Sequence, residues 1–194
     1  MMFGLIDLPD QLHTEASPLV LYRIHHKDYH PVFFGKTGDY RFDAPDQGFG
    51  VLYAASAPEG AFVEAVLRQK TGRPGRFIAR TYLATRKLSV LHLERSVTVA
   101  KLHGNGLARN HANSEISAIE PYTSSQQFSR ALFLHSNAVA GLSYRCRHDN
   151  EQIAWALFDR SEHLLARIDI PDTTLDQDED WLEQLQDRYD IIYC

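Results

Sequence analysis

Glu64 is the residue whose surroundings in the sequence most directly suggest chemistry. It stands in an apolar stretch with helical spacing, made up of Phe62, Val63, Ala65 and Val66. The carboxylate is therefore expected at or near a helix face that packs inward, where it is costly unless paired or functional. Two interpretations follow. Glu64 stabilises positive charge on a substrate, or it forms a buried salt bridge with Arg23 or Arg68.

Arg23 and Arg41 offer charge of the opposite sign, and each follows a tyrosine. A guanidinium can grip phosphate or carboxylate oxygens through paired, charge-assisted hydrogen bonds. The arginines are scattered and few of them adjoin, a pattern that suits individual anion contacts better than a DNA-binding stripe. For each of the two, a surface or structural salt bridge is the alternative interpretation.

Several other kinds of site lack their motifs. His25, His26 and His30 lie close together, but the chain has no HExxH and no cysteine–histidine pair with zinc-finger spacing, so no metal site is expected. The sequence also lacks GxGxxG, GxxxxGK[ST] and GxSxG. These absences weaken a dehydrogenase, an NTPase or an α/β-hydrolase assignment.

The elements that must position these residues are mainly short strands. Strands are expected at residues 19–24, 51–55, 77–83, 88–93, 141–146, 153–158 and 164–170, with residues 190–194 as a closing strand. Helices are expected after a capping box of Ser56 and Glu59, after residues 123–126, and after Asp176 as the cap of an acidic segment. Because the order has no regular βαβ rhythm, the expected class is α+β.

The domain organisation expected from the length is simple. A chain of 194 residues favours one compact domain, assigned here to residues 18–194, with residues 1–17 as a tail or capping segment. Residues 26–50 are rich in Gly, Asp, Pro and aromatic side chains and indicate a long ordered loop. A loop of that length in a compact domain is usually functional.

An ordered set of fragments resembles the RES domain, a family named for its arginine, glutamate and serine. The fragments are LYR at 21–23, YRF at 40–42, GVLYAA at 50–55, AFVE at 61–64, GLSYRCR at 141–147 and ALF at 156–158. The order of the fragments carries the resemblance, and it extends over roughly residues 19–170. It implies one α+β domain similar to the ADP-ribosyltransferase fold, with NAD as the substrate.

The resemblance also implies roles for single residues. Breaking the nicotinamide–ribose bond of NAD builds oxocarbenium character on the ribose, as in glycoside cleavage. Glu64, Arg41 and Arg23 would then be the catalytic set, with both arginines clamping the pyrophosphate and Glu64 holding ribose hydroxyls. Tyr53 would stack on the nicotinamide ring, with core packing as the alternative.

The sequence departs from the family pattern in two places. The family serine usually stands in Tyr-x-Ser-x-Arg, and here the frame reads YRCR at 144–147, which puts Cys146 at the serine position. Ser143 is expected on the opposite face of the strand. A thiol resembles a hydroxyl in shape and weak polarity. Cys146 is thus expected either to contact substrate or to be a small buried residue. In addition, Tyr40 replaces the more usual Gly before Arg41, and Phe42 replaces the more usual Trp after it.

The implied function is that of a toxin-like enzyme that degrades NAD as a glycohydrolase or phosphorylase, with a helix-turn-helix antitoxin as partner. One alternative is a protein ADP-ribosyltransferase that uses NAD. The other is a catalytically decayed nucleotide-binding or interaction module, which the cysteine at the serine position keeps open. The acceptor stays open among water, phosphate and a protein side chain.

Composition and charge narrow the remaining classes. A net charge of −5 argues against direct nucleic-acid binding, and the absence of an apolar run of about 18 residues argues against a membrane span. The first ten residues contain no basic side chain and do not fit a secretory signal. Cys146 and Cys194 do not make a disulfide framework, so a cytoplasmic location is expected. A homo-oligomer or a hetero-oligomer is compatible with the sequence.

Overall fold

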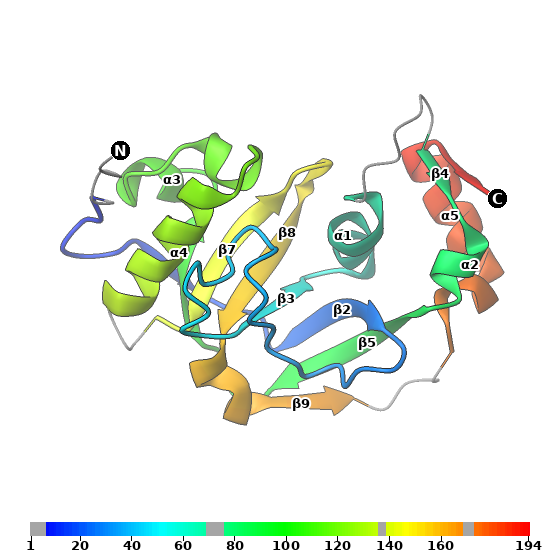
Figure 1. Cartoon of the computed structure of the whole chain (residues 1–194), viewed down its shortest axis with the longest axis horizontal. Coiled ribbons are helices and arrows are strands. Elements are labelled where there is room, and N and C mark those ends of the chain that lie inside the picture. The colour runs from blue at the N-terminus through cyan, green and yellow to red at the C-terminus, as the bar shows by residue number, and fades with distance from the viewer. Residues whose placement is uncertain (1–6, 69–75, 136–138, 169–172) are drawn as a thin grey trace.

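The computed structural model describes residues 7–68, 76–135, 139–168 and 173–194 and shows one α+β domain, as the sequence predicts (Figure 1). The strands of its main sheet are β1 (Thr14–Ala16), β2 (Val20–His26), β3 (Val51–Ala55), β5 (Arg86–Leu93), β6 (Thr98–Leu102), β7 (Gly141–Cys146), β8 (Asp149–Phe158) and β9 (Leu165–Ile168). Their order across the sheet is β1-β6-β7-β8-β3-β2-β5-β9. Neighbouring strands are antiparallel, except for the parallel pair β6 and β7.

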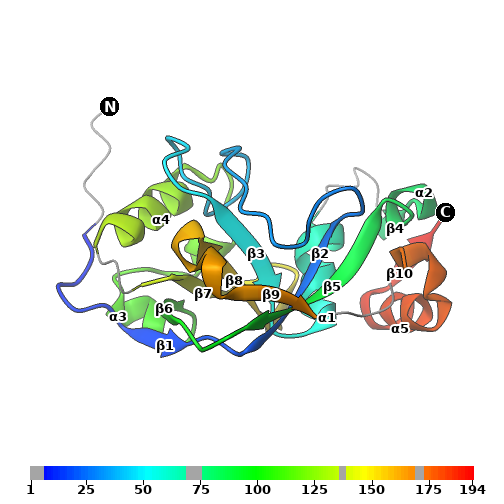
Figure 2. The ribbon, with the colours of Figure 1, turned by 90° about the horizontal axis from the view of Figure 1, so that it is seen from below.

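Helices and short helical turns surround this sheet. They are α1 (Pro58–Phe62), η1 (Val63–Leu67), α2 (Arg80–Leu83), α3 (Gly106–Arg109), η2 (Ser114–Ser117), α4 (Thr123–His135), η3 (Asp159–Leu164), η4 (Leu175–Gln177) and α5 (Glu179–Tyr189). Strands β4 (Arg76–Ile78) and β10 (Ile191–Tyr193) form a second, parallel sheet near α5 and α2 (Figure 1, Figure 2). Every helix in the described parts of the chain is too short or too polar to traverse a bilayer.

The main sheet consists of two well-paired halves that meet at one residue pair. β2 pairs with β5 along its whole length, and β3 pairs with β8 along its whole length. Between β2 and β3, however, the backbone pairing is confined to Tyr22 and Ala55. Further along, the Arg23 side chain donates to the carbonyl of Tyr53 at 3.5 Å. The two strands therefore diverge and leave room between them for side chains and a ligand.

Alternation along the strands divides the core into two layers. On β7, Leu142 and Tyr144 face the larger cluster, which also contains the apolar residues of α1, η1, α4 and α5. On β2 and β3, Leu21 and Leu52 face the smaller cluster on the other side of the sheet. Alternate residues of these strands thus point to opposite faces of the sheet, and both faces are buried.

Some expected elements and caps are corrected by the structure. Residues 77–83 were predicted as one strand, but they form the end of β4 and the helical turn α2. Ile78 on β4 and Leu83 on α2 are both buried. Ser56 does not cap α1, because its hydroxyl donates to the carbonyl of Ile153 at 3.2 Å and Ala57 takes the cap position.

The cap of α5 also differs from the prediction. Asp178, and not Asp176, accepts a hydrogen bond from the backbone N–H of Trp181 at 3.2 Å. Both aspartates carry the charge that favours a helix N-terminus, so only the path of the backbone selects between them. Asp176 lies within the preceding turn η4, and α5 begins after Asp178, at Glu179.

Candidate functional site

A cleft of about 530 Å³ opens where β2 and β3 diverge, with α1 and η1 along one side. Its volume falls within the range of pockets that hold small molecules and cofactors. Side chains that could act on a ligand line it, namely Arg23, Tyr40, Tyr53, Glu64, Arg68 and Arg86. Three of the five residues predicted as site residues, Arg23, Tyr53 and Glu64, therefore come together here.

Glu64 reaches the cleft from a wide helical turn. The helix begins at Pro58 and continues as η1, in which the N–H of Arg68 donates to the carbonyl of Val63 at 3.2 Å, five residues back. Single turns of this kind are frequent at functional sites. Glu64 is half-buried in it, while Phe62 and Val63 are fully buried, so the predicted inward-facing position is confirmed.

Gly60 allows α1 to lie close against the sheet. A Cβ atom at this position would be 2.9 Å from the Cβ of Ala55 and 3.4 Å from the side chain of Gln152. A larger residue would push the helix away from β3 and β8, and Glu64 would move with it.

Tyr144 on β7 forms a hydrogen bond with the carboxylate of Glu64. Its hydroxyl donates to Oε2 of Glu64 at 2.9 Å, and the tyrosine is fully buried. Burial, followed by the charge of Glu64, raises the pKa of Tyr144 well above its usual value, so the phenol stays protonated as a donor. Glu64 makes no salt bridge with Arg23 or Arg68 in the described chain. This role of Tyr144 was not predicted, although its position two residues before Cys146 indicates a shared face of the strand.

Cys146 lies behind Glu64 and does not line the cleft. It is buried, and its Sγ is 3.9 Å from the carbonyl oxygen of Gly60. Burial and then the nearby Glu64 carboxylate raise the pKa of the thiol far above its usual range. Ser143 lies on the other face of β7, as expected, where its hydroxyl donates to Glu15.

The cleft is rich in positive charge. Burial lowers the pKa of Arg23 to about 10, so the guanidinium remains charged at neutral pH. None of Arg23, Arg68 and Arg86 forms a salt bridge with a described carboxylate, and Glu64 is the one carboxylate among the described lining residues. Nε of both Arg23 and Arg86 is buried without a hydrogen-bond partner in the described chain. Buried polar groups are normally satisfied, so this cleft favours an anionic ligand.

Aromatic rings form the opposing wall. The ring of Tyr53 meets that of Tyr40 edge to face at 5.9 Å, and the guanidinium of Arg68 lies 4.6 Å above Tyr40. The hydroxyl of Tyr53 donates to Asp43 at 2.9 Å and accepts from the N–H of Phe42 at 2.9 Å. These bonds fix the position of Tyr53 in the wall of the cleft, where the residue stays half-buried.

Arg41 lies outside the cleft. It is buried, its Nη1 is 3.5 Å from the carbonyl oxygen of Ile119, and its guanidinium lies 4.7 Å above the ring of Tyr122. Arg41 is therefore not among the described residues that line the cleft with Arg23, although the two were predicted to clamp the same group.

Helix α4 holds the loop that carries Arg41 and Tyr40. The loop and α4 lie side by side in both views of the ribbon (Figure 1, Figure 2). Gln126 donates to the carbonyls of Gly38 and Tyr40 at 2.7 and 2.9 Å, and Ser129 donates to that of Phe42 at 2.7 Å. The long loop predicted at residues 26–50 is thus ordered by a helix that follows about eighty residues later.

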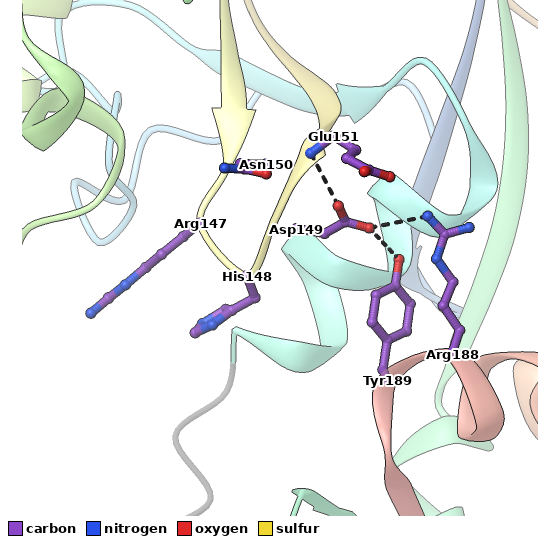
Figure 3. A pocket seen from close by; sticks show the side chains of 7 residues that line it. All are labelled: Arg147, His148, Asp149, Asn150, Glu151, Arg188 and Tyr189. Carbon is purple, nitrogen blue, oxygen red and sulfur yellow. Dashed lines mark hydrogen bonds and ion pairs between the residues drawn. The ribbon is translucent and has the colours of Figure 1, made fainter.

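A second hollow, of about 470 Å³, lies beside the turn between β7 and β8 (Figure 3). Its centre is Asp149, which accepts a hydrogen bond from Tyr189 at 2.8 Å and pairs with Arg188 at 3.3 Å. Arg147 and His148 point away from this carboxylate. The contacts attach α5 to the β7–β8 turn, and we interpret this hollow as structural.

The histidines of the first strand region are engaged with the protein itself. Nε2 of His25 is 2.8 Å from the hydroxyl of Ser89, and its Nδ1 is 2.9 Å from the carbonyl oxygen of His26. Among the residues that the structure describes, no group of three or more His, Cys, Asp or Glu could hold a metal ion.

The chain was compared with curated proteins, solved structures and family models. None of the curated proteins matches the chain. Among solved structures, the chain is similar to one in the crystal structure of the M. tuberculosis MbcT–MbcA toxin–antitoxin complex, with a TM-score of 0.61, 14% identity and 91% of each chain covered. At that identity the likeness shows a shared fold. The family model of the RES domain matches residues 20–181, which include the cleft and Glu64, and the chain therefore belongs to the RES-domain family.

Proposed function

We propose that this protein degrades NAD by breaking the bond between nicotinamide and ribose, as a glycohydrolase or phosphorylase. The observation that carries the proposal is the Glu64 carboxylate, which accepts a hydrogen bond from Tyr144. It shares the cleft with aromatic rings and with guanidinium groups that form no salt bridge to a described carboxylate. NAD has the matching parts, with two phosphates, ribose hydroxyls and a cationic ring.

In this proposal each lining residue acts on one part of the substrate. Arg23 binds the pyrophosphate through charge-assisted hydrogen bonds. Tyr53 provides the wall against which the nicotinamide ring rests. Glu64 accepts hydrogen bonds from ribose hydroxyls and stabilises the positive charge that grows on the ribose.

The bond changes balance without a further reactant besides the acceptor. The electron pair of the C1′–N bond returns to the nicotinamide nitrogen, which leaves as a neutral ring. An oxygen of water or phosphate forms the new bond to C1′ and, in the case of water, loses its proton to solvent. With a protein side chain as acceptor, the same steps would make the chain an ADP-ribosyltransferase.

Arg41 and Cys146 are not among the described residues that line the cleft, and in this scheme they act on residues that do. Arg41 lies next to Tyr40 and packs the loop against Tyr122, so its effect on substrate runs through the position of that loop. Cys146 is buried at the end of β7, where its thiol lies against the carbonyl of Gly60 on α1. Both are expected to position other groups without touching NAD.

We further propose that the protein is a toxin whose activity is blocked by a helix-turn-helix antitoxin. Support comes from family membership and from a similar fold in a toxin–antitoxin complex. NAD loss would explain toxicity, because an unblocked cleft would drain a shared cofactor of the cell.

The test is release of nicotinamide from NAD, followed by proton NMR with and without phosphate. Glu64→Gln should lower the rate by about 100- to 1000-fold, the loss typical of removing one electrostatic stabiliser. The exposed Glu183→Gln on α5 serves as the matched control and should keep the wild-type rate. Unchanged turnover by Glu64→Gln would exclude Glu64 from the reaction. NAD binding without turnover by the wild type would favour a decayed binding module.

A further inference from the structure

Three aromatic side chains at one end of the cleft remain without a role in the scheme above. Tyr29 and Phe33 are 65% and 54% exposed, although both line the cleft together with His26. The rings of Tyr29 and Phe33 are stacked, with centroids 6.3 Å apart and planes 24° apart, and the ring of His26 lies 5.4 Å from that of Tyr29. Exposed stacked rings inside a cleft provide a surface for another flat ring.

This aromatic group and Glu64 reach the same cleft from different elements. Glu64 stands on η1, whereas Tyr29 and Phe33 follow the end of β2. One extended ligand that carries two rings could therefore contact both groups.

A cation accompanies the aromatic group. Arg86 pairs with His26 across β2 and β5, and its side chain lines the same end of the cleft. Its guanidinium lies 4.6 Å above the ring of Tyr82, and its Nε is buried without a hydrogen-bond partner in the described chain. This end of the cleft thus offers both a stacking surface and a hydrogen-bond donor for a phosphate.

We propose that Tyr29 and Phe33 form a purine subsite that stacks the adenine base of the dinucleotide, with Arg86 contacting the phosphate next to it. The assignment rests on the proposed function, since it places the nicotinamide at Glu64 and the adenylate at Tyr29 and Phe33. Stacking on aromatic side chains suits a base because every base has a flat π-face. The subsite would make the enzyme prefer the dinucleotide over its nicotinamide half.

The experiment titrates the two halves of NAD separately by calorimetry, so its outcome does not depend on turnover. The probes are 5′-AMP and nicotinamide mononucleotide, and the variant is Tyr29→Ala/Phe33→Ala. We expect the variant to bind 5′-AMP roughly tenfold or more weakly while its affinity for nicotinamide mononucleotide stays the same. Tyr29→Phe, which keeps the ring, should bind 5′-AMP like the wild type.

The control is Leu134→Ala, which removes a side chain of similar exposure, 65%, from α4 outside the cleft. It should bind both probes as the wild type does. Unchanged binding of 5′-AMP by the double variant, equal loss of both probes, or no binding of 5′-AMP by the wild type would each overturn the subsite. If the wild type binds both halves but releases no nicotinamide from NAD, the subsite stands and the proposed reaction fails.

Discussion

The phenol of Tyr144 on β7 donates a 2.9 Å hydrogen bond to the carboxylate of Glu64 on η1, and the two residues are eighty positions apart in the chain. The bond links η1 to β7, the third strand in the order of the main sheet. A carboxylate with one fixed donor has fewer orientations available, which favours a site that must place negative charge at one point.

Tyr144→Phe should therefore lower kcat by roughly tenfold, the value of one hydrogen bond to a charged group, and leave KM for NAD nearly unchanged. Steady-state rates of nicotinamide release measure both constants. Tyr189→Phe is the matched control, because it removes a 2.8 Å bond from a phenol to Asp149 outside the cleft. Equal loss of kcat in the two variants would mean that Tyr144 only supports the fold.

Cys146 should resist alkylation in the folded protein. Its side chain is buried, and burial together with the Glu64 carboxylate raises the pKa of the thiol, so little thiolate forms at neutral pH. Cys194 is exposed and should react. Intact-mass measurement after iodoacetamide should show one adduct in native protein and two after unfolding in urea. Two adducts on the native protein would contradict the burial of Cys146.

Arg23→Met should weaken binding and strengthen the fold. Replacing a guanidinium whose Nε is buried without a hydrogen-bond partner, and which has no described carboxylate partner, with an apolar side chain removes a desolvation cost. Thermal unfolding should therefore occur a few degrees higher. The same change removes the contact proposed for the pyrophosphate and should raise KM about 10- to 100-fold. Arg95→Met, at an exposed position, is the control for both measurements. A lower unfolding temperature with unchanged KM would assign Arg23 a structural role.

Glu15 should make the stability of the fold depend on pH. Burial tends to raise its pKa, but hydrogen bonds from Ser143, His103 and Lys101 outweigh this effect and lower it below the usual value. The stabilisation is therefore present above the unfolded pKa near 4.5 and is lost as the pH falls through the lower, folded value.

Glu15→Gln should accordingly unfold at lower urea concentration than the wild type at pH 7, and the gap between the two should narrow at pH 3. Glu15 connects β1 to β6 and β7, so the loss should be visible by circular dichroism as one cooperative transition. A gap that stays constant from pH 7 to pH 3 would show that the charge of Glu15 makes no contribution.

Apolar runs, turn residues and helical spacing in the sequence predicted those elements that depend on residues close together in the chain. Strands β3 and β7 follow from their apolar runs and turn signals, and the inward position of Glu64 follows from the apolar side chains around it. Caps were predicted less well, since Asp176 and Asp178 have the same chemistry and differ only in the path of the backbone. At residues 77–83, a strand and a short helix bury the same apolar side chains, so the pattern could not distinguish them.

The sequence by itself determined the α+β class, the family, and the residue types that a cleft for an anionic, ring-bearing ligand requires. Only the tertiary structure decided which of these residues meet. It brought Arg23, Tyr53 and Glu64 to one cleft, placed Arg41 against Ile119 and Tyr122, and bonded Tyr144 to Glu64. The physical reason is that strand order and the divergence of β2 from β3 depend on contacts between residues far apart in the chain, which local periodicity does not encode.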